Sequence, residues 1–191
     1  MKITIKRLTS WDEVYDSALF TQRKEPNGKK PTSKWKLKTC YAQHSVLRDL
    51  IFTIKIEDVE SQIISHLIRH QKEFTQPYVQ TLREDLTGIP SDTVTRLTKN
   101  GVKFTLNAKS IIDISRVRLC NKASIDTRLV WKAVIEELRK IEPELTQICV
   151  PQCVEKGFCQ EYQTCGFDES IKFEEERSKF VENCKVNNRR I

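Results

Sequence analysis

The spacing of hydrophobic and polar residues predicts two strands and a helix in the first third of the chain. Apolar and polar residues alternate over 2–6, and residues 50–56 are apolar and rich in β-branched side chains, so each segment is expected to form a strand. Ser10 and Glu13 have the spacing of a capping box, which predicts a helix over about 11–22.

Helical spacing of apolar residues predicts three more helices, over 56–72, 107–119 and 125–141. Residues 23–34 are polar and contain glycine and proline, which predicts a loop, and residues 75–105 are expected to be irregular. Together these elements predict an α+β fold, in which long helices pack against a small β-sheet. The 191 residues fit a single domain.

Composition and charge indicate the cellular location expected for the protein and the kind of ligand that it binds. No apolar run approaches the ~18 residues of a membrane span, and the opening segment has no apolar core of the signal-peptide type, so a cytoplasmic location without a membrane partner is expected. The net charge of +7, from 33 basic and 26 acidic residues, favours anionic ligands. Nucleic acid is not the expected ligand, because much of the charge lies in loops such as 24–38 and not on one element.

The segment from Asn107 to Arg128 carries the most informative chemistry. Asn107 and Arg118 are about three helical turns apart, so both project from nearly the same face of the predicted helix. The apolar residues Ile111 and Ile114 lie near that face, which predicts a packed helix. Arginine is seldom buried without an anionic partner, and a substrate phosphate or an ionised base would serve as one.

A second group of polar residues, His66, Arg69 and His70, is spaced at i, i+3 and i+4, so its members share one face of the predicted 56–72 helix. A solvated face, a metal site and an anion-binding edge are the alternatives. The zinc-protease motif requires glutamate beside the first histidine, where Leu67 stands, so a metal is not favoured. Anion binding would use the forked donors of the Arg69 guanidinium.

Four of the seven cysteines cluster near the end of the chain, namely Cys149, Cys153, Cys159 and Cys165. Four thiolates could hold a structural zinc ion, but the CxxC spacing typical of zinc knuckles is missing. Free thiols are the favoured interpretation and no metal site is assigned, with zinc and disulfides as alternatives. The remaining cysteines are expected to be buried or inert thiols: Cys40, Cys120 and Cys184.

Taken in order, these segments resemble the flavin-dependent thymidylate synthase family. NAKS, then Arg118, then ASIDTR are similar to the family's NARS, arginine and AQWEIR, with Ala123, Asp126 and Arg128 at the places of its alanine, glutamate and arginine. Arg69-His70-Gln71 resembles the family's RHR triplet with its third member changed.

Two flanking segments extend the resemblance. His44-Ser45 followed by LIFTI resembles the loop and strand before the triplet, and the Cys-rich end resembles that of the clostridial and phage-type branch. The resemblance implies a fold like that of the thymidylate synthase-complementing proteins. The expected organisation is one synthase-like domain over 1–167, with the Cys-rich segment 149–166 at its end, and a charged tail over 168–191.

The resemblance also implies roles for individual residues. The implied flavin contacts are Ser45, Arg69, His70, Gln71 and Asn107. Arg118 is the implied catalytic residue, and it contacts the nucleotide together with His66. The family places a serine and an arginine after its triplet to hold the nucleotide phosphate, and Val79 stands where the serine is expected. With one residue inserted, the phosphate-binding side chains would be Gln80, Thr81 and Arg83.

The function implied by the resemblance is reductive methylation of dUMP to dTMP. The implied enzyme is a homotetramer that uses FAD, takes reducing equivalents from NADPH and takes its carbon unit from methylenetetrahydrofolate. Because Val79 replaces the serine, a relative that binds flavin and a pyrimidine nucleotide but has lost or changed the reaction is the alternative within the family. A small basic nucleic-acid-binding protein is the alternative from another class.

Overall fold

The computed structural model describes residues 1–26, 28–70 and 77–188, with only the backbone for 186–188. The strands are β1 (Lys2–Arg7), β2 (Ile51–Glu60), β3 (Tyr78–Val79) and β4 (Lys99–Asn107). The helices are α1 (Trp11–Phe20), α2 (Ser33–Tyr41), α3 (Ser61–Ile68), α4 (Glu84–Thr87), α5 (Ala108–Arg118), α6 (Ile125–Arg139), α7 (Pro143–Thr146), α8 (Gln152–Lys156) and α9 (Ile171–Asn188). Three short 3₁₀ helices are η1 (Ser45–Asp49), η2 (Ser91–Thr93) and η3 (Phe167–Glu169).

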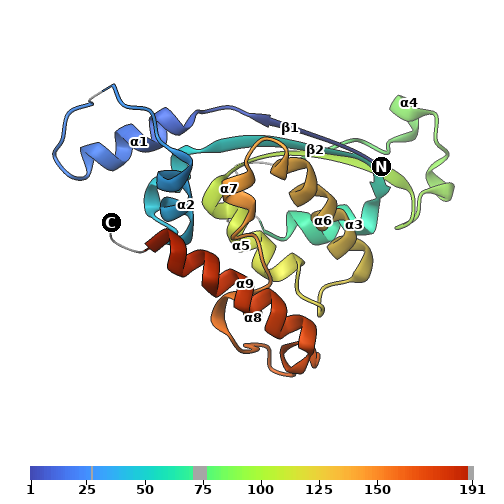
Figure 1. The fold of residues 1–191 in the computed structure, drawn as a ribbon. Coiled ribbons are helices and arrows are strands. Elements are labelled where there is room, and N and C mark those ends of the chain that lie inside the picture. Colours follow the sequence, from blue (N-terminus) through green and yellow to red (C-terminus); the bar gives the residue numbers. More distant parts are fainter. Residues whose placement is uncertain (27, 71–76, 189–191) are drawn as a thin grey trace.

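The four strands form one antiparallel sheet in the order β1-β2-β4-β3. Ile5 lies opposite Ile54, which in turn lies opposite Phe104, so one row of apolar side chains crosses the three longer strands. Ile54 and Phe104 are buried, and they belong to the main core. Helices α3, α5 and α6 lie along one face of the sheet (Figure 1). These features confirm the predicted α+β fold with a small sheet and packed helices.

The structure corrects the predicted boundary between β2 and α3. Helical spacing placed residues 56–60 in a helix, but β2 continues to Glu60 and α3 begins at Ser61. Ile56 pairs with Ile3 on one side and with Val102 on the other, so two neighbouring strands hold it in the sheet. A bulge follows, where Asp58 has a φ of 59°. The same apolar residues suit a strand and a helix, and strand pairing decides between them.

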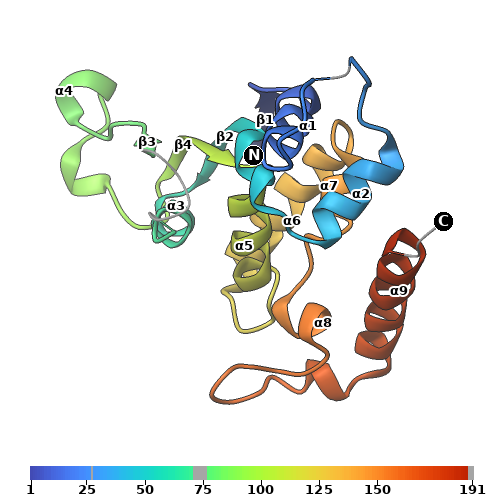
Figure 2. The same cartoon turned by 90° about the vertical axis from the view of Figure 1, so that its left-hand side faces the viewer.

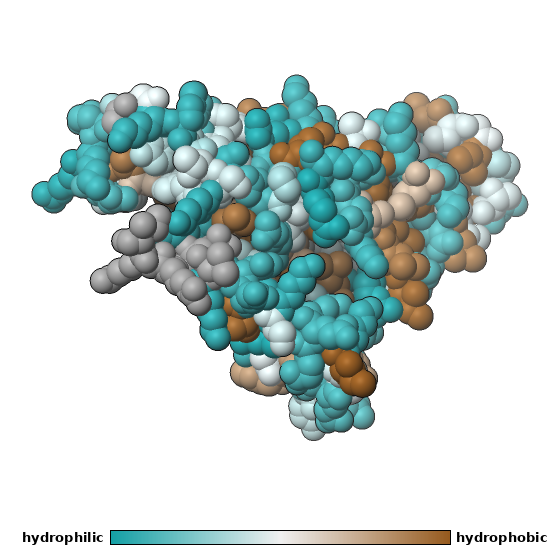
Figure 3. All heavy atoms as spheres, viewed as in Figure 1, coloured by the Kyte–Doolittle hydropathy of each residue, from teal (hydrophilic) through white to brown (hydrophobic). Residues whose placement is uncertain are grey.

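A second correction concerns residues 75–105, which were expected to be irregular. Residues 99–107 form β4, which lies between β2 and β3 in the sheet. Residues 78–98 form an arm at the edge of the sheet that carries β3, α4 and η2, and Figure 2 shows it projecting away from the helices. The space-filling view in Figure 3 is mostly hydrophilic, with apolar patches toward the side where the arm lies. The exposed apolar residues of the arm include Tyr78, Leu86 and Leu97.

The charged tail forms an ordered helix, α9, that packs against the rest of the chain through a few aromatic residues. Phe173 is buried, and the ring of Phe180 lies 5.5 Å from that of Tyr41 in α2. α2 itself begins inside the segment predicted as a loop, where the Thr32 hydroxyl accepts the N–H of Trp35. Within the described ranges, no helix is long and apolar enough to span a bilayer.

Candidate functional site

The C-terminal ends of α3 and α5 meet, and four of the predicted site residues lie there. His66 is in the last turn of α3, Arg69 and His70 directly follow that helix, and Arg118 is the last residue of α5. The guanidinium of Arg118 donates a hydrogen bond through Nη2 to the backbone carbonyl of His66. Nδ1 of His66 lies 2.9 Å from the hydroxyl of Thr127, which ties α3 to α6. We call His66, Arg69, His70 and Arg118 the cationic cluster.

Burial and mutual repulsion set the protonation states in the cationic cluster. Burial, followed by the positive charge of Arg118, lowers the pKa of His70 from 6.5 to about 4. Burial also lowers the pKa of His66, and the charges of Arg118 and Arg69 add to that effect. The pKa of Arg118 is itself lowered, first by burial and then by Arg69. Near neutral pH His70 is therefore uncharged beside two arginines, an arrangement that attracts anions.

Two nitrogen atoms in the cationic cluster are buried without a hydrogen-bond partner among the described residues. They are Nε of Arg118 and Nε2 of His70. Arg118 also forms no ion pair with any carboxylate in the described part of the chain. Buried polar atoms are nearly always paired in folded proteins. The donor set therefore fits a polar, anionic ligand such as a nucleotide or a flavin.

Asn107 stands at the opposite end of α5 from Arg118. It is the N-cap of the helix, and its side-chain oxygen accepts both the backbone N–H of Ser110 at 2.9 Å and the Ser110 hydroxyl at 3.0 Å. A helix rises 1.5 Å per residue, so the two ends of α5 are roughly 16 Å apart. Asn107 and Arg118 can touch the same ligand only if that ligand is extended.

Ser45 lies apart from the cationic cluster, at the start of η1. It lines a cavity of about 530 Å³ whose other walls include Phe20, Lys24 and Asp49. Arg69 is not among the described residues that line this cavity, so the predicted flavin contacts Ser45 and Arg69 do not share it. Gln71, the third member of the triplet, lies outside the described residues.

The three predicted phosphate-binding residues lie on the exposed arm. Gln80 follows β3, and its backbone N–H bonds to the carbonyl of Gly101 at 2.9 Å. The hydroxyl of Thr81 accepts the backbone N–H of Arg83. The guanidinium of Arg83 is bonded to Asp85, with nitrogen–oxygen distances of 2.6 Å and 3.0 Å. To bind phosphate, Arg83 would exchange an exposed carboxylate for the ligand.

Sequence reasoning missed Thr127. It is fully buried and holds the His66 ring, but the ASIDTR segment gives no signal for that role. Reasoning from sequence also missed a polar network behind α5, in which Arg116 donates from Nε to Glu155 at 2.5 Å and is bonded to Asp113 and Gln43. These contacts join three segments distant in sequence, so local patterns could not reveal them.

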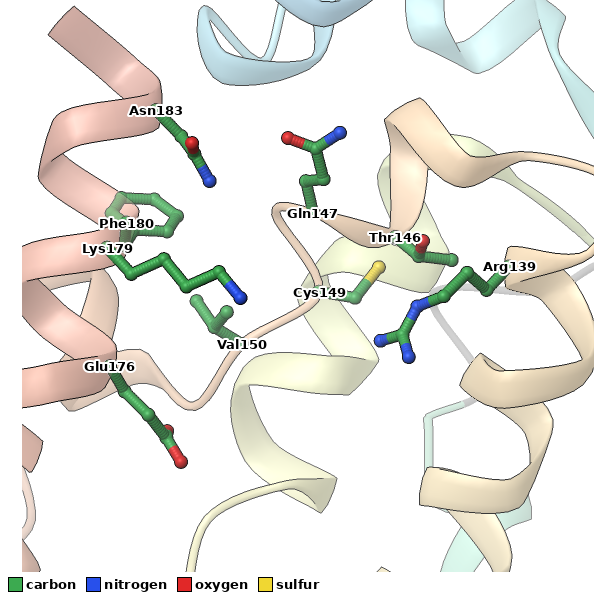
Figure 4. A pocket seen from close by; sticks show the side chains of 9 residues that line it. All are labelled: Arg139, Thr146, Gln147, Cys149, Val150, Glu176, Lys179, Phe180 and Asn183. Carbon is green, nitrogen blue, oxygen red and sulfur yellow. The ribbon is translucent and has the colours of Figure 1, made fainter. Parts of the chain in front are cut away.

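The cysteines group differently from their order in the sequence. Cys149 is buried, its thiol lies 3.5 Å from the Leu145 carbonyl, and burial raises its pKa to about 12. It lines a cavity of about 490 Å³ between α9 and the α6–α7 region, where Figure 4 shows it opposite Lys179 and Phe180. The other three predicted candidates line a different, much smaller cavity. Among the described residues, no three His, Cys, Asp or Glu side chains already stand together as metal ligands.

An antiparallel sheet covered by helices, with a cationic cluster between two of them, defines an α+β protein equipped to bind an anionic ligand. No protein-family model matches the chain. It is 24% identical to flavin-dependent thymidylate synthases of Sulfurisphaera tokodaii and Saccharolobus solfataricus, and each match covers 58% of this chain. The chain spans 58% of the length of these relatives, which is less than two thirds.

Solved structures share the fold. A flavin-dependent thymidylate synthase from Helicobacter pylori, complexed with FAD and dUMP, superposes with a TM-score of 0.64 at 15% identity, covering 78% of this chain and 100% of that one. A UMP/dUMP methylase from Streptomyces cacaoi, bound with 5-Br dUMP, superposes with a TM-score of 0.57 at 10% identity, covering 77% and 94%. The chain is thus similar in sequence to flavin-dependent thymidylate synthases, and it shares the fold of the solved Helicobacter pylori enzyme.

Proposed function

We propose that this protein is a flavin-dependent enzyme that methylates C5 of dUMP to give dTMP, with Arg118 as the catalytic residue. The observation that carries the proposal is the state of Arg118. Its guanidinium is half-buried beside two histidines and a second arginine, its Nε has no acceptor among the described residues, and no described carboxylate neutralises it. A uracil edge or an anionic pyrimidine would complete this environment.

The residues of the chain would have separate roles in binding and catalysis. Arg118 would donate to the uracil edge and favour the electron-rich, N3-deprotonated base, which activates C5. Arg69 and the neutral ring of His70 would contact the flavin, and Asn107, at the far end of α5, would contact a more distant part of it. Bound reduced FAD would supply the hydride, with NADPH as its reductant and methylenetetrahydrofolate as the carbon source.

The nucleotide phosphate is assigned to the arm. Arg83 would bind it after leaving Asp85, and Gln80 or Thr81 would donate a further hydrogen bond. Because the pair between Arg83 and Asp85 is exposed, breaking it costs at most about 1 kcal/mol. The arm lies at the sheet edge next to β4, whereas Ser45 lies in a separate cavity, so a homotetramer in which subunits complete one another's sites would suit this dispersed set.

A second candidate function is C5 modification of a related pyrimidine nucleotide. Two observations favour it: Val79 stands at the place of the family's serine, and a UMP/dUMP methylase shares the fold. The two candidates predict the same cationic cluster but different nucleotides or products. Product analysis with dUMP and with UMP therefore separates them.

The test is a measurement of flavin absorbance and dTMP formation for the purified protein and its variants. Arg118→Ala should abolish activity and leave FAD bound, because the lost group acts on the pyrimidine. Arg139→Ala, an exposed arginine paired with Glu136 on α6, is the matched control and should retain both. If Arg118→Ala keeps more than half of the wild-type turnover, the assignment of Arg118 is wrong. A protein that takes up no FAD at all favours the nucleic-acid-binding alternative.

The affinity for FAD tests the roles proposed for Arg69 and His70. Removing Arg69 deletes a charge-assisted bond of about 1.5–3 kcal/mol, which corresponds to roughly a 10- to 100-fold weaker FAD affinity. Removing His70 should cost less, about 0.5–1.5 kcal/mol, because its lowered pKa leaves the ring neutral. Equal FAD affinity in the wild type and both variants would show that Arg69 and His70 do not contact the flavin.

A further inference from the structure

A group of cysteine side chains lies at the junction of α5, α8 and the loop that leads to α9. Cys120 follows the end of α5, Cys153 is in α8, and Cys159 and Cys165 are in the loop. All four line one cavity of about 20 Å³. A space of this size holds a single water-sized particle and excludes an organic ligand. The tertiary structure thus surrounds one ion-sized space with four thiols.

Hydrogen bonds hold the walls of this cavity in place. The backbone N–H of Lys122 points at the sulfur of Cys120, with a nitrogen–sulfur distance of 3.5 Å. Asp168 fastens the loop by accepting the backbone N–H of Cys159 at 3.3 Å and the hydroxyl of Thr164 at 2.5 Å. Amide donors to sulfur and fixed loops of this kind support metal–thiolate sites in proteins.

The charges around the cavity also favour a cation. Glu161 and Asp168 lie on its wall. Among the described residues that line the cavity, Arg116 is the one arginine, and its guanidinium is already engaged by Asp113 and Glu155. Its positive charge is therefore balanced and does not oppose an ion in the cavity.

We propose that Cys120, Cys153, Cys159 and Cys165 form a four-thiolate site for a thiophilic divalent cation, with Zn²⁺ as the ion that suits it best. Zn²⁺ takes four thiolates in a tetrahedron at about 2.3 Å. Among the described residues the ligands are not yet gathered at metal distance. Binding of the ion would therefore require the four sulfurs to move toward one another, and it would release their protons.

This set differs from the one suggested by sequence order in a single member. Cys149 is closest in sequence to the other three, but it faces the larger cavity beneath α9 (Figure 4). Cys120 comes from the end of α5 and takes its place. Bound Zn²⁺ would therefore link the C-terminal segment to α5, the helix that carries Arg118.

The experiment uses the full chain, purified with a reductant and without a metal-affinity step. We expect one equivalent of zinc by elemental analysis, and Co²⁺ substitution should give the charge-transfer absorbance of four thiolates. Cys120→Ser should lower that absorbance to the value for three thiolates. Changes outside the ligand shell of metal sites already cost 10- to 100-fold in affinity, so loss of a ligand should weaken Zn²⁺ binding by at least about 100-fold.

Two matched controls keep the proposal open to refutation. Cys184→Ser, on α9 outside the cavity, and Cys149→Ser, in the larger cavity, should bind Co²⁺ with the wild-type spectrum. The proposal is overturned if the wild type binds no metal at micromolar Zn²⁺ or Co²⁺. It is also overturned if Cys149→Ser loses the spectrum while Cys120→Ser keeps it.

Discussion

The effect of His70 on the pH dependence of stability tests the cationic cluster without relying on catalysis. Its ring is half-buried, Nε2 has no partner among the described residues, and burial together with the charge of Arg118 lowers its pKa from 6.5 to about 4. Between these two pH values the unfolded chain binds a proton that the folded protein does not. Stability should therefore fall as the pH is lowered from about 6.5 toward 4.

The size of the effect follows from the pKa values. At about 1.4 kcal/mol per pH unit, the full difference between 6.5 and about 4 would contribute roughly 1.8 kcal/mol between pH 7 and pH 5. Because the ring is only half-buried, water screens it, and we expect about half of that value, roughly 1 kcal/mol. The pH range stops at 5 so that most carboxylates stay ionised throughout.

The assay is urea unfolding of the wild type, His70→Asn and the control His44→Asn at pH 7 and pH 5. His70→Asn should lose less stability than the wild type on acidification, by about 1 kcal/mol. His44→Asn leaves His70 in place and should keep the wild-type dependence. With three histidines in the chain, NMR titration of the ring protons gives a direct check. Equal acid sensitivity in wild type and His70→Asn, or a His70 ring that titrates near 6.5, would refute the reasoning.

Two further substitutions test contacts outside the cationic cluster. Glu142 is 1% exposed and accepts the indole N–H of Trp11 at 2.7 Å, so Glu142→Ala leaves that buried donor unpaired and should lower the free energy of unfolding by about 1–3 kcal/mol. Glu137→Ala, which removes a partly exposed carboxylate paired with Lys140, should change it by less than about 1 kcal/mol. A loss below about 1 kcal/mol for Glu142→Ala would contradict this. A Cβ at Gly101 would lie 2.5 Å from Oε1 of Gln80, so Gly101→Ala should displace that flexible, exposed side chain. The free energy of unfolding should fall by less than about 1 kcal/mol. The KM for dUMP should rise, as it should in Gln80→Ala. An unchanged KM in Gly101→Ala, with Gln80→Ala impaired, would show that the two residues are not coupled.

Local sequence signals were sufficient to predict a helix wherever the contacts that define the helix join residues only a few positions apart in the sequence. The capping box is present, since the backbone N–H of Ser10 bonds to the Glu13 carboxylate at 2.8 Å and α1 begins at Trp11. α6 covers Ile125–Arg139, close to the predicted 125–141, because its apolar residues keep one face toward the core over four turns. By contrast, the i, i+3, i+4 spacing of His66, Arg69 and His70 predicted one helical face, but α3 ends at Ile68, so Arg69 and His70 lie beyond the helix.

Elements that depend on distant partners could not be derived from local pattern. Residues 99–107 contain glycine and lysine and resemble a loop, yet they form a central strand because β2 and β3 pair with them on both sides. Ile56 has helical spacing to Ile63 and Ile64, but pairing with β1 and β4 keeps it in β2. Strand pairing joins residues about fifty positions apart, and its energy exceeds local propensity.

For the candidate site, the sequence by itself determined which side chains are available, and the tertiary structure decided which of them meet. Helix periodicity predicted the faces that carry Arg118 and His66, but only the crossing of α3 with α5 and α6 brings the Arg118 guanidinium to the His66 carbonyl and Thr127 to the His66 ring. Likewise, sequence proximity favoured Cys149, whereas folding brings Cys120 to the other three thiols. The physical reason is that contacts between elements depend on how buried faces pack, and one sequence pattern is compatible with many packings.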